Sequence, residues 1–166
     1  MIVRRERRGD VAAARQVHVE AFPTEVEARL LDELREDEGW LPELSLVAEE
    51  ADEVVGHVVC TRGTIGADHR PALGLGPVAV RPAHQGRGVG SALVHAVLAV
   101  AEARGDTLVA LLGSRDFYGR LGFVPATDHG VEAPDASWGD QFQVRVLDPS
   151  AVVAGPFEYA APFGRL

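Results

Sequence analysis

The segment that most constrains this chain is Val78–Gly90, in which an apolar stretch passes through Arg81-Pro82 into a turn with three alternating glycines. Residues 89–104 then repeat apolar side chains at helical spacing, and Gly105 marks the end of that pattern. A turn of this kind, placed between a strand and a long helix, leaves the amides of the first helical turn unpaired. Together with the helix dipole, such amides form a binding site for a phosphate or pyrophosphate.

Two common phosphate-binding loops do not match this segment. A P-loop ends in Gly-Lys-Ser/Thr, but the sixteen basic residues of this chain are all arginine. Gly86, Gly88 and Gly90 also lack the Gly-x-Gly-x-x-Gly spacing of a dinucleotide-binding fold. Without a lysine or evident magnesium ligands, the loop is suited to holding a pyrophosphate rather than to phosphoryl transfer. The structural alternative is a tight glycine turn ahead of a core helix.

The rest of the pattern predicts a mixed α/β domain. Two amphipathic helices come first. One runs from Gly9-Asp10 to near Phe22-Pro23, and the other opens at Thr24 with a Thr24–Glu27 capping box and ends before Gly39. Strands are expected at 44–49, 54–61, 73–80, 107–112, 123–126 and 141–147, with a short helix at 116–121. Strand 73–80, the long helix and strand 107–112 form one right-handed crossover between parallel neighbours. The other strands are expected to be antiparallel.

Strand 73–80 is unusual because it contains Gly74, Gly76 and Pro77. Glycine and proline inside a strand indicate a bulge or a place where pairing stops. An irregular edge strand would explain the same residues.

Size and composition limit the function further. The 166 residues fit a single domain, 1–166, and the net charge of −9 argues against a nucleic-acid partner. Cys60 is the only cysteine and the six histidines lack metal-site spacing, so we expect no disulfide and no metal. The polar N-terminus and the absence of a long apolar run predict a cytoplasmic protein that does not enter a membrane.

The run Gln85-Gly86-Arg87-Gly88-Val89-Gly90 resembles the Gln/Arg-x-x-Gly-x-Gly/Ala signature of the GNAT superfamily of N-acetyltransferases. The resemblance implies a mixed, mostly antiparallel central sheet with one splayed parallel strand pair and flanking helices. It also implies acetyl-CoA as cosubstrate, with its pyrophosphate on the loop and its pantetheine arm along the preceding strand. The residues expected to bind it are Val78, Ala79, Val80, Gln85, Gly86, Arg87, Gly88, Val89, Gly90 and Ser91.

Ser114–Phe123 resembles a second signature of this family, in which an aromatic pair leads into a Phe/Leu-Gly-Phe turn. Tyr118 falls at the position of the family's tyrosine general acid. A phenol is protonated at neutral pH and can protonate a leaving thiolate. Phe117 and Leu121 are interpreted as core residues. Many family members have Asn or Asp where this chain has Gly113-Ser114, which is a departure from the pattern.

The implied reaction is direct attack of an amine on the thioester, with the backbone amide of Val80 polarising the carbonyl. Family members differ in the general base, and Glu25, Glu49 and His57 are unranked candidates by their expected position. A non-catalytic acyl-CoA-binding or sensing module on the same fold is the alternative. A nucleotide-binding protein conflicts with the glycine spacing.

The acceptor is expected to be the primary amine of a small molecule or peptide, selected by the connections at 22–25 and 128–140. The second connection is rich in acidic and aromatic residues, which favours a cationic amine over a neutral one. A solvated loop in an acidic protein is the alternative. The aromatic tail at 148–166 is expected to pack on the domain or on a partner subunit, which would give a homodimer.

Overall fold

A computed structural model describes residues 1–166 as a sheet of nine strands with helices on both faces. The helices are α1 (Val11–Ala21), α2 (Val26–Arg35), α3 (Val89–Arg104) and α4 (Arg115–Tyr118). The strands are β1 (Ile2–Arg5), β2 (Ser45–Glu50), β3 (Glu53–Ile65), β4 (Arg70–Val80), β5 (Leu108–Leu112), β6 (Val124–Pro125), β7 (Val131–Glu132), β8 (Phe142–Val146) and β9 (Gly155–Glu158). Short 3₁₀ turns connect several of them.

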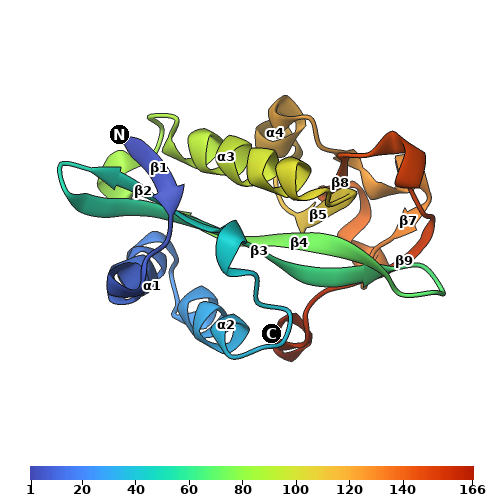
Figure 1. The fold of residues 1–166 in the computed structure, drawn as a ribbon, viewed down its shortest axis with the longest axis horizontal. Coiled ribbons are helices and arrows are strands. Elements are labelled where there is room, and N and C mark those ends of the chain that lie inside the picture. The colour runs from blue at the N-terminus through green and yellow to red at the C-terminus, as the bar shows by residue number, and fades with distance from the viewer.

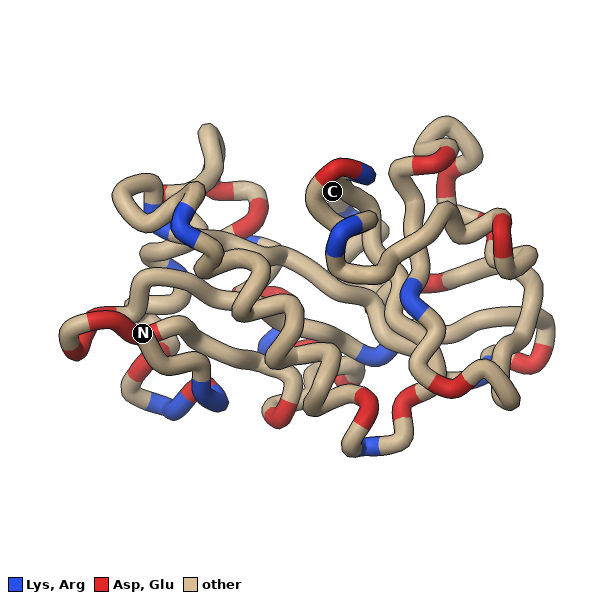
Figure 2. The backbone as a smooth tube through the Cα atoms, turned by 90° about the horizontal axis from the view of Figure 1, so that it is seen from above, with Lys and Arg blue, Asp and Glu red and all other residues tan.

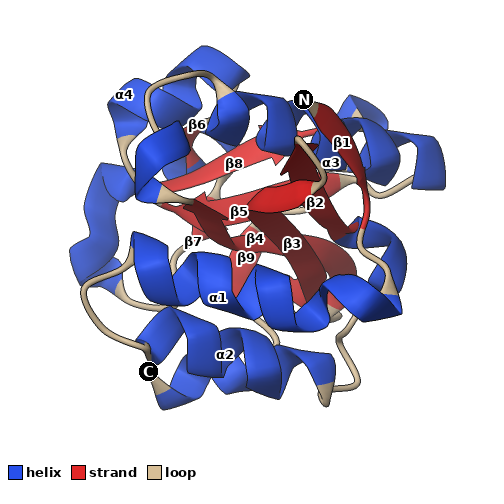
Figure 3. Cartoon of the chain, turned by 90° about the vertical axis from the view of Figure 1, so that its left-hand side faces the viewer, coloured by secondary structure: helices blue, strands red, loops and turns tan.

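The strands follow the order β1-β2-β3-β4-β5-β8-β6, and β9 pairs with both β3 and β7. On the main path only β4 and β5 run parallel, as the sequence predicts. The two-residue parallel pair of β7 with β9 was not expected from the sequence. Helices α1 and α2 cover one face of the sheet, and α3 and α4 cover the other (Figures 1 and 3).

Helix α3 has the bounds that the sequence predicts, because both of its ends are set by glycines with positive φ. Gly88 precedes the first turn with φ 83°, and Gly105 caps the last turn with φ 84°. The inward-facing residues of α3 join the largest buried cluster with side chains of β2, β3, β4 and β5. The glycine turn is thereby held firmly against the sheet.

The bulge expected in β4 is present. Val58 of β3 pairs with Val78, but Cys60 pairs with Leu75, so Gly76 and Pro77 together oppose one residue of β3. On the other side, β4 pairs with β5 only at Leu73 and Gly74. The two parallel strands therefore separate where the bulge begins, as predicted.

Helix α2 begins at Val26 rather than Thr24, and the predicted capping box does not form. The amide of Val26 donates a long 3.4 Å hydrogen bond to Thr24 Oγ1. Glu27 makes no hydrogen bond to the Thr24 amide and instead lines a cavity beside the sheet.

The C-terminal tail packs on the chain itself. Phe157 of β9 pairs with Ile65 of β3, and Phe163 packs beside Leu30 and Leu34 of α2. A Cβ added to Gly74 would lie 2.5 Å from the ring of Tyr159, so the tail ring needs a glycine in β4.

Charged residues are distributed around the whole chain. Acidic positions occur on many turns and helices, with arginines scattered between them (Figure 2). No helix has both the length and the apolar character needed to cross a membrane.

Candidate active site

The separation of β4 from β5 leaves backbone groups of β4 without a strand partner. Arg81 N donates a 2.9 Å hydrogen bond to Val55 O of β3. In an antiparallel ladder, pairs that share hydrogen bonds alternate with pairs that do not, so the next pair, Val80 and Gly56, shares none. By the same alternation, Val78 also directs its amide and carbonyl away from β3. These groups face the side on which β5 has already diverged.

The glycine turn is exposed around its two glycines with positive φ. Gly86 and Gly88 have φ values of 72° and 83°, and an added Cβ at either position would have no neighbour within 4 Å. None of the backbone amides from Gly86 to Ser91 donates a hydrogen bond within the chain. Six consecutive free donors at the start of a 16-residue helix can hold an anion of the size and charge of a pyrophosphate.

Side chains hold this turn to the strand before it. Gln85 Nε2 donates a 2.9 Å hydrogen bond to Val80 O, which fixes the turn relative to the end of β4. Arg87 is exposed, and its guanidinium lies 3.3 Å from the carboxylate of Glu50 at the end of β2.

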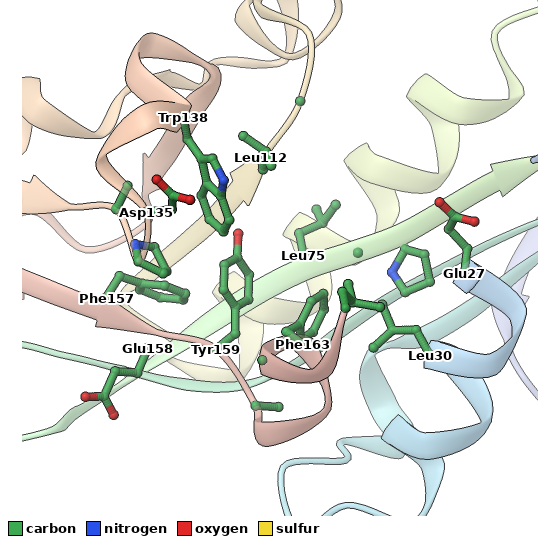
Figure 4. A pocket seen from close by; sticks show the side chains of 18 of the residues that line it. Glu27, Leu30, Leu75, Leu112, Asp135, Trp138, Phe157, Glu158, Tyr159 and Phe163 are labelled. Carbon is green, nitrogen blue, oxygen red and sulfur yellow. The ribbon is translucent and has the colours of Figure 1, made fainter.

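A cavity of about 910 Å³ lies beside the bulge of β4. Its walls come from Phe22, the first half of α2, the bulge, the end of β5, the 133–138 segment and the tail (Figure 4). Residues Leu75–Val78 of β4 line it, so the cavity meets the sheet where β4 and β5 separate.

Tyr118 lines this cavity from the other face of the sheet. Its ring packs edge-on against Phe117 and Phe123, at centroid distances of 4.8 and 5.7 Å. A Cβ at Gly113 would lie 2.4 Å from the Tyr118 ring, so the tyrosine requires glycine there. Burial raises the pKa of Tyr118 to about 12, with a smaller contribution from Cys60. Its hydroxyl makes no hydrogen bond within the chain, and the residue lines the cavity.

The comparison with known families agrees with this geometry. A model described as the Acetyltransferase (GNAT) family matches residues 11–123, which include the bulged strand, the glycine turn and Tyr118. The chain belongs to the GNAT acetyltransferase family. The predicted GNAT fold is likewise confirmed by the solved structures that resemble it.

Two GNAT relatives from Escherichia coli are similar over most of the chain. The uncharacterized N-acetyltransferase YjhQ is 38% identical over 130 residues, covering 76% of this chain and 72% of YjhQ. The uncharacterized N-acetyltransferase YhbS is 32% identical over 148 residues, covering 87% of each chain.

Two solved GNAT structures contain CoA or acetyl-CoA. The crystal structure of YhbS from E. coli in complex with CoA has a TM-score of 0.90 at 28% identity, covering 99% of this chain and 92% of YhbS. A GNAT acetyltransferase from Brucella melitensis, in complex with acetyl-CoA, has a TM-score of 0.80 at 33% identity, covering 98% and 97%.

The three candidate bases of this GNAT chain all lie outside the cavity. Glu25 is exposed and pairs with Arg15 at 3.3 Å. Glu49 accepts a 2.9 Å hydrogen bond from Nε of Arg4.

His57 is fully buried, and burial lowers its pKa. Its Nδ1 lies 2.9 Å from His18 Nε2, and its Nε2 lies 2.9 Å from Ser45 Oγ. Its surroundings are those of a structural residue inside the GNAT fold, since both ring nitrogens already have partners.

The structure brings to the cavity two polar residues that were not singled out from the sequence. Glu27 was interpreted as part of a helix cap, because its spacing from Thr24 has that form. Tyr159 lies in the tail, and Figure 4 shows its hydroxyl directed between Leu75 and Trp138. No local sequence signal distinguishes either residue, because each reaches the cavity only through tertiary packing.

The connections expected to select the acceptor contribute only in part. Phe22 lines the cavity, as do the residues of 133–135 and Trp138. Asp128, His129, Glu132 and Asp140 do not line it, and Asp140 pairs with Arg115 at 3.2 Å. The tail forms much of the remaining wall.

Proposed function

We propose that this protein is an acetyl-CoA-dependent N-acetyltransferase that acylates a primary amine by direct attack within a ternary complex. The observation that carries this proposal is the row of free amides from Gly86 to Ser91, next to a splayed strand pair that leads to a cavity. Family membership and the CoA complexes of the relatives support it.

In this proposal the pyrophosphate of acetyl-CoA binds the glycine turn through main-chain amides, including those of Gly86, Gly88 and Gly90. The pantetheine arm enters between β4 and β5 and pairs with the backbone of Val78 and Val80, whose polar groups have no strand partner on that side. The acetyl group then lies at the bulge, where the cavity begins.

The acceptor nitrogen first loses a proton to a base and then attacks the thioester carbon, forming the C–N bond. The amide of Val78, the first free donor of β4 after the bulge, stabilises the negative oxygen of the tetrahedral intermediate, in place of the Val80 amide expected from the sequence. As the C–S bond breaks, Tyr118 donates its phenolic proton to the sulfur, and the proton released by the new amide nitrogen restores the phenol. The products are an N-acetylated amine, CoA and one proton.

The proposal is tested by placing a carboxylate in the glycine turn. Gly88→Asp adds negative charge and a side chain where the pyrophosphate would bind, at a φ of 83° that favours glycine. We expect acetyl-CoA affinity, measured by calorimetry, to fall about 100-fold or more, because the variant replaces attraction with repulsion.

Gly105→Asp is the matched control, since Gly105 also has positive φ, open space and a place at an end of α3. It should retain acetyl-CoA binding. Equal binding by wild type and Gly88→Asp would contradict the proposed site. Tight acetyl-CoA binding without turnover of any amine would instead favour a non-catalytic acyl-CoA-binding module.

A further inference from the structure

Three carboxylate side chains line the cavity, but only one lacks a partner in the chain. Asp135 Oδ1 accepts a 2.8 Å hydrogen bond from the amide of Ser137. Glu158 is largely exposed, lies 3.7 Å from His69, and points away from the cavity in Figure 4. Glu27 makes no hydrogen bond or ion pair, and its Oε2 is buried from solvent.

A buried carboxylate oxygen without a donor is costly, so proteins almost always supply one. No group of the chain donates a hydrogen bond to Glu27 Oε2. No arginine lines the cavity. A bound ligand with N–H donors and positive charge would satisfy Glu27.

The wall away from Glu27 is aromatic. It consists of Trp138 together with Phe157, Tyr159 and Phe163 of the tail (Figure 4). Tyr159 lies at the centre of this group, with ring centroids 4.8 Å from Phe157 and 4.6 Å from Phe163. Such a surface binds an apolar or aromatic body, and its ring faces tolerate positive charge.

We infer that the acceptor is a small cationic amine with an aromatic body, and that Glu27 binds its ammonium group and takes its proton. The inference rests on the proposed acetyl transfer. The ammonium R–NH₃⁺ gives one proton to the Glu27 carboxylate, and the neutral amine attacks the acetyl carbon at the adjacent bulge. The carboxylic acid then returns that proton to solvent, which accounts for the one proton released per turnover.

A merely structural role for Glu27 is the competing explanation. A carboxylate in the first turn of α2 interacts favourably with the helix dipole. In that case Glu27→Gln would lower stability slightly and leave ligand binding unchanged.

The test compares three ligands on the CoA-saturated protein by calorimetry: 2-phenylethylamine, its neutral analogue 2-phenylethanol, and propylamine, which lacks the ring. We expect 2-phenylethylamine to bind about 10-fold or more tightly than either analogue, because only it has both the charge and the ring. Glu27→Gln should abolish the preference for the amine over the alcohol. It should also lower kcat/KM for 2-phenylethylamine about 100-fold, by removing the base.

Glu36→Gln is the matched control, because it removes the same charge from the exposed far end of α2 and should behave as wild type. Equal wild-type affinity for the amine and the alcohol, or unchanged kinetics in Glu27→Gln, would overturn the role of Glu27. Turnover of propylamine as fast as 2-phenylethylamine would overturn the aromatic preference while acetyl transfer stands. Glu27-dependent binding of the amine with no acetylated product would uphold the ligand class and refute acetyl transfer.

Discussion

Tyr118 has the environment that its proposed role as a proton donor requires. Its hydroxyl makes no hydrogen bond within the chain, its ring is held by Phe117 and Phe123, and burial raises its pKa to about 12. The sign of this shift matters, because a phenol with a raised pKa remains protonated throughout the neutral range and can act as an acid. Gly113 is required for the same arrangement, since any side chain there would collide with the ring.

Tyr118→Phe removes the proton donor and keeps the ring. We expect kcat to fall about 10-fold or more while acetyl-CoA affinity stays nearly constant, because the lost interaction acts on the leaving thiolate. Stopped-flow measurement of CoA release would check the rate, and calorimetry would check the affinity. An unchanged kcat would remove Tyr118 from the mechanism.

At the scale of elements, a buried polar network joins the helices of one face to the sheet. Glu6, just after β1, accepts hydrogen bonds from Arg35 of α2 and Ser45 of β2. His57 of β3 contacts Ser45 and also His18 of α1. This network attaches the short edge strand β1 to the rest of the fold. It also explains why His57, a candidate base in the sequence, has a structural environment.

The network predicts a loss of stability in acid. Burial alone would raise the pKa of Glu6, but His57, Arg35 and Ser45 outweigh it and lower the pKa from 4.5 to about 2. The stabilisation is therefore present above pH 4.5 and is lost as the pH falls toward 2. Burial, with a smaller effect of His57, lowers the pKa of His18 from 6.5 to about 3, so protonation of the unfolded chain favours unfolding below pH 6.5.

Urea unfolding between pH 7 and pH 3 should show this decline. Glu6→Gln should lower the free energy of unfolding at pH 7 by about 3 kcal/mol, since it breaks a buried ion pair. The same variant should reduce the pH dependence below 4.5. A wild-type stability that is flat from pH 7 to pH 3 would contradict these roles of Glu6 and His18.

At the scale of the whole molecule, the sequence predicts those features that are determined by residues close together in the chain. Helix α3 and its glycine turn follow from caps and periodicity within one segment. The bulge and the separation of β4 from β5 follow from Gly74, Gly76 and Pro77. Together with the resemblance carried by two motifs, Gln85–Gly90 and Ser114–Phe123, these features are enough to predict the GNAT fold.

The walls of the cavity could not be predicted in the same way. Strand β9 was missed because Gly155 and Pro156 do not look like a strand, and its pairing with Ile65 joins distant parts of the chain. Glu27 was assigned to a helix cap because a capping box and a cavity residue have the same local pattern. Both outcomes were decided by tertiary packing rather than by neighbouring residues.

The central claim is that main-chain amides of the glycine turn bind the diphosphate of the cosubstrate. A crystal structure of the protein grown with CoA tests it most directly. We predict diphosphate oxygens at roughly 2.7–3.2 Å from amides of the Gly86–Ser91 segment, with the pantetheine arm between β4 and β5. A CoA molecule bound elsewhere, or a glycine turn with its amides paired to protein atoms, would contradict the claim.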